Sequence, residues 1–269
     1  GSLLGSEVLG YYTRAQSSVF SIVKASASVI NPVFYSIVSQ SGNQQKFQQN
    51  AFFRSYEVLI IVMPYLAGVL LFFSDDVISL LFGSSWLESA NILQVFGIAL
   101  LFRPLSKINV EMIKALGSIR SLVLIWGFAL LFFVCLAIFL GSQLGAPGVA
   151  IAYVITSVMI FFSSTKKCLN ILKINAYIFL KRLSLAYLRA IIVITALGLL
   201  KWWGFAANDV DFGYLANLVI ISLVCVALYL TTSIILRVEA DDDYLRFFGL
   251  TEERFPVLRI LKKFGGTNV

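Results

Sequence analysis

The sequence contains no histidine, and this absence excludes several kinds of site. Histidine is a common general base and the commonest nitrogen ligand of zinc, so neither a His-based catalytic triad nor a conventional His-based metal site can form. The three cysteines, Cys135, Cys168 and Cys225, are too widely spaced for a zinc pattern or a disulfide framework. We expect them to be small buried hydrophobic residues, and we expect no metal and no cofactor.

Charged residues are also scarce, at 13% of the chain, where soluble domains carry about 25%. Hydrophobic residues reach 59% and the mean hydropathy is +0.89, which is more apolar surface than a soluble chain of 269 residues could bury. Because a membrane span needs about 20 mostly apolar residues, the sequence predicts an all-α, polytopic transmembrane helix bundle of about seven spans. The predicted spans are residues 15–38, 54–73, 88–112, 120–140, 147–164, 185–203 and 214–236.

The loops between these spans alternate between basic and non-basic. Residues 166–189 are rich in lysine and arginine, whereas residues 74–88 carry only acidic charges. By the positive-inside rule, the N-terminal residues lie outside the cytoplasm and the C-terminal tail lies inside it. This topology accounts for the net charge of +7, so no nucleic-acid partner is expected. Residues 72–87 predict a short helix on the outer surface, with Trp86 as its interface anchor.

The first span carries polar residues that a lipid-facing helix does not need. They fall within about 140° of arc on a helical wheel. They are Arg14, Ser17, Ser18, Ser21, Lys24, Ser28 and Asn31. A cation at the centre of a membrane helix costs about 2.5–3.5 kcal/mol, so a sequence retains it mainly where it faces water, a partner or a polar ligand. This face predicts the wall of a transporter cavity.

The third span has a second polar face. Arg103, Lys107, Glu111 and Lys114 fall within about 80° on the wheel, and Lys107 and Glu111 have the spacing of an ion pair. Pro104 follows Arg103 and is expected to kink the helix.

Prolines in two other spans are also expected to kink their helices. Pro32 and Pro64 join Pro104 as candidate hinges, because a kink lets one half of a helix move against the other.

A cavity shared by these two faces would be positive and would attract anions, phosphate and pyrophosphate above all. The predicted substrate-binding residues are Arg14, Lys24, Arg103, Lys107, Ser21, Ser28 and Asn31. No catalytic residue is predicted. The alternative is that Arg14 lies at the outer interface and Lys107 and Lys114 at the inner one, each extending its charge toward water.

The later spans read as scaffold. Small residues at the start of the fifth span, Gly145, Gly148, Ala150 and Ala152, allow close helix packing. The last two spans are candidates for an appendage outside the transport path. The tail, residues 237–269, is predicted either to rest on the anionic inner leaflet or to be a solvated, disordered segment.

Several short segments resemble one family of transporters. They are residues 3–16 (LLGSEVLGYYTRAQ), 31–35 (NPVFY), 80–97 (LLFGSSWLESANILQVFG) and 145–154 (GAPGVAIAYV). Together these segments resemble the Wzx-type flippases, the polysaccharide-transporter branch of the multidrug/oligosaccharidyl-lipid/polysaccharide exporter superfamily.

The resemblance implies two lobes of six helices around a central cavity. This chain would be the second lobe, with residues 1–165 lining the transport path and residues 166–236 forming a basic cytoplasmic loop and two appended helices. Its partners would be membrane lipids, an N-terminal lobe of the same protein and a lipid-linked oligosaccharide carried on undecaprenyl pyrophosphate. The setting would be the bacterial inner membrane, in lipopolysaccharide or exopolysaccharide biosynthesis by alternating access.

Three other functions stay open from the sequence. A multidrug efflux pump of the same superfamily would favour acidic residues in its cavity, where this chain has cations. A membrane enzyme would need a large external loop or clustered catalytic residues, and neither is found, so we expect a non-enzyme. A structural subunit of a polysaccharide-export assembly would not need cations deep in its spans.

Overall fold

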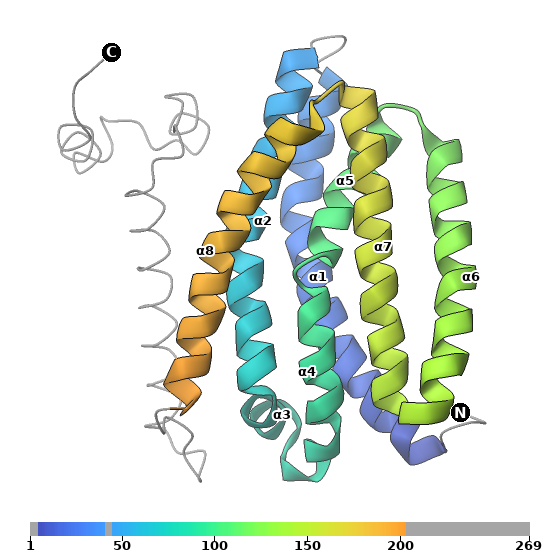
Figure 1. Cartoon of the computed structure of the whole chain (residues 1–269), viewed down its shortest axis with the longest axis vertical. Coiled ribbons are helices and arrows are strands. Elements are labelled where there is room, and N and C mark those ends of the chain that lie inside the picture. The colour runs from blue at the N-terminus through green and yellow to red at the C-terminus, as the bar shows by residue number, and fades with distance from the viewer. Residues whose placement is uncertain (1–4, 41–44, 203–269) are drawn as a thin grey trace, which may run out of the picture. The chain divides into compact units, whose positions relative to one another are not determined.

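The computed structural model describes residues 5–40 and 45–202; the side chains of residues 27–40 and of several positions in 54–61 and 182–200 lie outside the described set. All of its regular elements are helices, and the described residues contain no strand, which confirms the all-α prediction (Figure 1). The elements are α1 (Ser6–Gln40), α2 (Gln45–Phe72), α3 (Ser74–Phe82), the short 3-10 helix η1 (Ser84–Ser89), α4 (Ala90–Ala99), α5 (Arg103–Ala115), α6 (Ile119–Leu144), α7 (Ala146–Leu172) and α8 (Ala176–Trp202).

Most predicted spans coincide with one helix. Two helices, α6 and α7, are long and apolar enough to cross a membrane individually. Two bent pairs, residues 62–72 with α3 and residues 84–99 with α5, are apolar enough when each pair is taken as one span. The 35 residues of α1 and the 27 of α8 have the length to cross but carry more polar side chains. The predicted span 214–236 and the tail lie outside the described residues.

Two bends divide the bundle. The chain turns by 87° between the second half of α2 and α3, so residues 74–82 form the separate short helix that the sequence predicts. The predicted third span, 88–112, is broken at residues 100–102, where α4 and α5 meet at 45°.

The prediction of a kink inside a continuous helix at Pro104 is wrong in detail. The first helix ends before the proline, and Pro104 occupies the first turn of α5, where its missing N–H leaves no bond unmade. Pro64 does lie inside α2, whose helix continues on either side of it. The side chain of Pro32 is outside the described set.

The turn between α6 and α7 depends on its glycines. Gly145 has φ of 66°, in the left-handed region that favours glycine. A Cβ on Gly148 would stand 2.1 Å from the carbonyl oxygen of Leu140, so only glycine permits the two helices to approach there. Ala150 and Ala152 are fully buried behind it. The close packing predicted from these small residues is confirmed.

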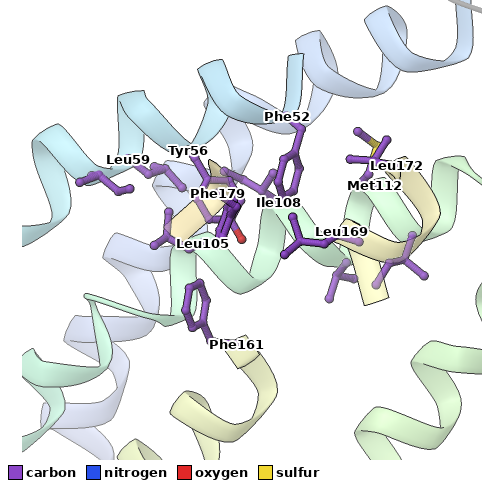
Figure 2. Packing of buried hydrophobic residues seen from close by; sticks show 14 of the residues in the cluster. Phe52, Tyr56, Leu59, Leu105, Ile108, Met112, Phe161, Leu169, Leu172 and Phe179 are labelled. Atoms are coloured by element: carbon purple, nitrogen blue, oxygen red, sulfur yellow. The ribbon is translucent and has the colours of Figure 1, made fainter. Parts of the chain in front are cut away.

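Two apolar clusters hold the bundle together. One joins α2, α5 and α7 with the start of α8, where the rings of Phe52, Tyr56 and Phe179 pack against Leu105 and Ile108 (Figure 2). The other joins α1 to α4 and α7 around Val19, Leu93, Phe96 and Ala150. The core therefore fixes α1 and α5, the two helices with polar faces, against α4 and α7.

Helix α6 packs on α7 and leaves much of its surface uncovered by protein (Figure 1). Most of its exposed side chains are apolar, as in Leu124, Phe128 and Leu131, which suits contact with lipid. Cys135 lies on this exposed surface, so the expectation that it is buried is wrong, whereas Cys168 in α7 is buried as expected.

Candidate functional site

The polar face of α1 lies opposite its buried side. Ala15 and Val19 are fully buried against α4 and α7, while Arg14, Ser21 and Lys24 are exposed. The hydrophobic side predicted from the sequence thus faces the core, and the predicted polar side faces away from it. Ser28 and Asn31 continue the same face in sequence, but their side chains lie outside the described set.

The serines of this face bond within their own helix. The Ser17 and Ser18 hydroxyls donate to the carbonyl oxygen of Arg14 at 2.9 and 3.0 Å, and Ser21 donates to that of Ser17 at 2.9 Å. Each hydroxyl oxygen keeps its lone pairs, so it can still accept a hydrogen bond from a ligand or water. The serines are therefore compatible with both an apolar surrounding and a polar cargo.

Arg14 lies at the end of the face nearest the α3–η1 segment. Its guanidinium carbon is 5.6 Å from the ring centre of Phe82 and 5.1 Å from that of Trp86. Tyr11, one turn earlier, contacts the same Trp86 ring edge-on at 5.8 Å and donates a hydrogen bond to Glu7. These aromatic contacts hold α1 to η1 while the arginine stays exposed.

Arg103 begins α5 and is held by two aromatic rings. Its Nε donates to the Tyr153 hydroxyl at 2.8 Å, and its guanidinium carbon lies 5.1 Å from the Tyr153 ring centre and 5.3 Å from that of Trp126. A guanidinium has five N–H groups, so four remain on the terminal nitrogens for an anion. The anchoring by Trp126 and Tyr153 was not predicted, because these residues come from α6 and α7 and no local pattern links them to Arg103.

Lys107 lies one turn beyond Arg103 and is half-buried. The ion pair predicted between Lys107 and Glu111 is wrong: the Glu111 carboxylate pairs instead with Lys114 Nζ at 3.0 Å. Both spacings put a cation within reach of Glu111, so sequence alone could not choose between them. Lys107 is left without that compensating carboxylate.

Packing brings the two polar helices together. Helix α1 lies against both α4 and α5, and the Phe20 ring of α1 is 5.6 Å from the Tyr153 ring that holds Arg103. A single surface shared by all four cations stays a prediction.

A buried polar cluster joins α2, α5 and α7, and no pattern in the sequence predicts it. Asn109, which is fully buried, accepts from the Tyr56 hydroxyl at 2.6 Å and donates to Ser164 at 3.0 Å and to Thr165 at 2.9 Å. Cys168 donates to the Asn109 carbonyl oxygen at 3.4 Å. The five side chains come from three helices, so only the fold assembles them. Each polar group has a partner, which marks a structural cluster.

Acidic ligands do not cluster in this region. Within residues 5–40 and 45–202, no group of three or more His, Cys, Asp or Glu side chains could hold a metal ion. The chemistry available on α1 and α5 is binding by cations and hydroxyls.

Comparison with known proteins gives matches in sequence and in fold. Residues 1–91 match a family described as "Polysaccharide biosynthesis protein". The chain is 28% identical over 177 residues to the teichuronic acid biosynthesis protein TuaB of Bacillus subtilis, a match that covers 65% of this chain and 36% of TuaB. The fold is similar to that of the lipid II flippase MurJ in an inward closed conformation, with a TM-score of 0.66 and 19% identity. That likeness covers 85% of this chain and 47% of the MurJ chain.

The chain spans about a third of the length of TuaB and about half of the MurJ chain. Its apolar helices and these matches mark it as a multi-pass membrane protein. The matches combine a sequence likeness to polysaccharide biosynthesis proteins with the fold of a lipid flippase. They confirm the resemblance to the Wzx-type flippases of the multidrug/oligosaccharidyl-lipid/polysaccharide exporter superfamily.

Proposed function

We propose that this chain is one lobe of a flippase that moves undecaprenyl-pyrophosphate-linked oligosaccharide repeat units from the inner to the outer leaflet of the bacterial inner membrane. The movement would occur by alternating access, in the synthesis of a surface polysaccharide, with the C-terminal tail in the cytoplasm. The sequence match to a polysaccharide biosynthesis family and the fold shared with a lipid flippase support this proposal.

The observation that carries the proposal is the set of four cations on the adjacent helices α1 and α5. Arg14 and Lys24 are exposed, and Arg103 and Lys107 are half-buried. In the described part of the chain, the one ion pair joins Glu111 to Lys114, so none of the four is neutralised by it. Unneutralised cations at membrane depth are costly, and an anionic cargo offsets that cost.

The pyrophosphate suits this arrangement. Arg103 is already oriented by Tyr153, which leaves its two terminal nitrogens in a fixed fork that matches the spacing of two phosphate oxygens. Lys24 and Lys107 would act as mobile point charges along the path. The hydroxyls of Ser17 and Ser21 would accept hydrogen bonds from sugar hydroxyls, and the lipid tail would remain in the bilayer.

A second lobe would supply the opposite wall. The chain accounts for less than half of each relative's length, and α1 exposes its polar side where no helix of the described bundle covers it. We propose that this side faces the other lobe across the cavity. Pro32, Pro64 and the break before Pro104 would serve as the hinges of its movement.

Genetic complementation tests the proposal. Variants of the full-length parent protein with Lys24→Ala, Arg103→Ala or both substitutions are expressed in a strain from which the natural protein has been deleted. We expect surface polysaccharide to fall at least about tenfold in the double variant at normal membrane abundance. Lipid-linked repeat units would accumulate in the cell.

The matched control is Arg120→Ala, which removes an exposed cation from the first turn of α6. A cation there opposes the helix dipole, so its loss should leave folding and export unchanged. Normal polysaccharide in the Lys24→Ala/Arg103→Ala variant would show that the charges are peripheral and would contradict the proposed path.

A further inference from the structure

Each bend in the bundle exposes backbone carbonyl groups that a continuous helix would satisfy. A helix that ends leaves its last carbonyl oxygens without N–H partners. Inside a membrane, water is not there to replace them, and each unsatisfied group costs several kcal/mol. At residues 100–102 the N–H groups of Leu100, Leu101 and Phe102 already donate to the carbonyls of Gly97, Ile98 and Ala99. Donors from other helices therefore reach the carbonyls that follow these, and those at the α2–α3 corner.

At the first bend the donor comes from α8. The Tyr187 hydroxyl donates to the carbonyl oxygen of Leu101 at 3.0 Å, although 86 residues separate them in the chain. The Tyr187 ring also stacks on Phe102, with ring centres 6.5 Å apart and planes 30° apart. One side chain of α8 thus contacts both residues that precede Arg103.

At the second bend α8 supplies another donor. Lys201 Nζ donates to the carbonyl oxygen of Phe72, the last residue of α2, and lies 5.5 Å from the ring centre of Phe73. The neighbouring carbonyl of Leu71 accepts from Gln94 of α4 at 2.7 Å. The charged end of α8 is therefore fixed at the corner where α3 turns away.

Other residues of α8 also hold it to the bundle. Leu197 is almost fully buried, and near the start of the helix Phe179 packs into the cluster with Phe52 and Tyr56 (Figure 2). Gly198 lies so close to α2 that a Cβ there would stand 2.9 Å from the Phe72 ring. Helix α8 is thus held along the length of α2 (Figure 1).

We infer that α8 is a brace for both bends and that Tyr187 is a positioning residue for the cations of α5. The brace itself stands on the contacts of α8, and the transport consequence rests on the proposed function. Residues 101–103 are clamped from two sides: Leu101 and Phe102 by Tyr187 of α8, and Arg103 by Tyr153 of α7. Release of the first clamp would let α5 change its angle to α4 and would shift Arg103 and Lys107 with it.

Hydrogen–deuterium exchange on the full-length parent protein in lipid nanodiscs tests the brace. Tyr187→Phe removes the hydroxyl and keeps the ring, and Lys201→Met removes the ammonium and keeps most of the stem. We expect Tyr187→Phe to speed exchange of residues 97–106 about three- to tenfold and to leave residues 69–77 unchanged. Lys201→Met should do the reverse. Tyr177→Phe, on the exposed start of the same helix, should change neither segment.

Surface polysaccharide is measured for the same variants, and Tyr187→Phe should lower it severalfold at normal abundance. Unchanged exchange in both variants, or an equal rise at both bends, would overturn the brace. Faster exchange at residues 97–106 with normal polysaccharide would overturn the positioning role of Tyr187. If the Lys24→Ala/Arg103→Ala variant exports normally, the proposed function fails, while the crossed exchange pattern still decides whether α8 braces the bends.

Discussion

At the scale of single residues, the fold depends on polar side chains that are buried and fully paired. Asn109 is the centre of one such set, with side-chain partners on α2 and α7. A hydrogen bond between membrane helices contributes about 0.6 kcal/mol on average, and a buried group that loses its partner costs more. The cluster therefore sets how α5 sits between its neighbours.

Asn109→Ala should destabilise the protein by about 1–3 kcal/mol, because it leaves the Tyr56 hydroxyl and the Thr165 hydroxyl with fewer partners in an apolar core. Thermal unfolding of the purified parent protein in detergent measures this as a lower midpoint. Ser142→Ala is the control, since that exposed hydroxyl bonds only to its own helix. Equal midpoints for the two variants would contradict the role assigned to Asn109.

Single-residue predictions from the sequence succeeded where one helix was enough. The polar face of α1 could be predicted because the burial of Ala15 and Val19 follows from helical periodicity alone. The contacts of Arg103 with the rings of Trp126 and Tyr153 could not be predicted, because they depend on how three helices meet.

At the scale of elements, breaks and close approaches shape the bundle more than helix length does. Pro104 predicted a kink in a continuous helix, whereas the structure has a break between two helices just before it. The α6–α7 contact was expected from the glycines at residues 145 and 148. The angle of each bend was not predictable, because it depends on donors from α4 and α8 that satisfy the freed carbonyls.

Gly148→Ala should disrupt the α6–α7 hairpin. The added Cβ would lie 2.1 Å from the Leu140 carbonyl oxygen. The Cβ is fixed to the backbone of α7 and the oxygen belongs to the backbone of α6, so neither can move aside without separating the helices. We expect lower membrane abundance and a lower unfolding midpoint, measured together. Gly127→Ala in α6 is the matched control, because a Cβ there has no neighbour within 4 Å and alanine favours the helix. A midpoint for Gly148→Ala equal to that of the control would show that the hairpin tolerates the added atom.

At the scale of the whole molecule, the packing of the core explains why the cations are available. Helices α1 and α5 direct their apolar sides into the two clusters and keep Arg14, Lys24, Arg103 and Lys107 at least partly accessible. An efflux pump for cationic drugs would need the opposite charge on these faces. A purely structural subunit would gain nothing that offsets the cost of such charges in a membrane.

Movement of a pyrophosphate-linked lipid across the bilayer of proteoliposomes tests the cationic path most directly. The full-length parent protein is reconstituted, and appearance of the sugar in the opposite leaflet is followed with a lectin that cannot cross the membrane. We expect the Lys24→Ala/Arg103→Ala variant to move the lipid at least about tenfold more slowly than the unaltered protein, with equal amounts inserted. Equal rates for the two proteins would contradict a path in which these cations carry the pyrophosphate.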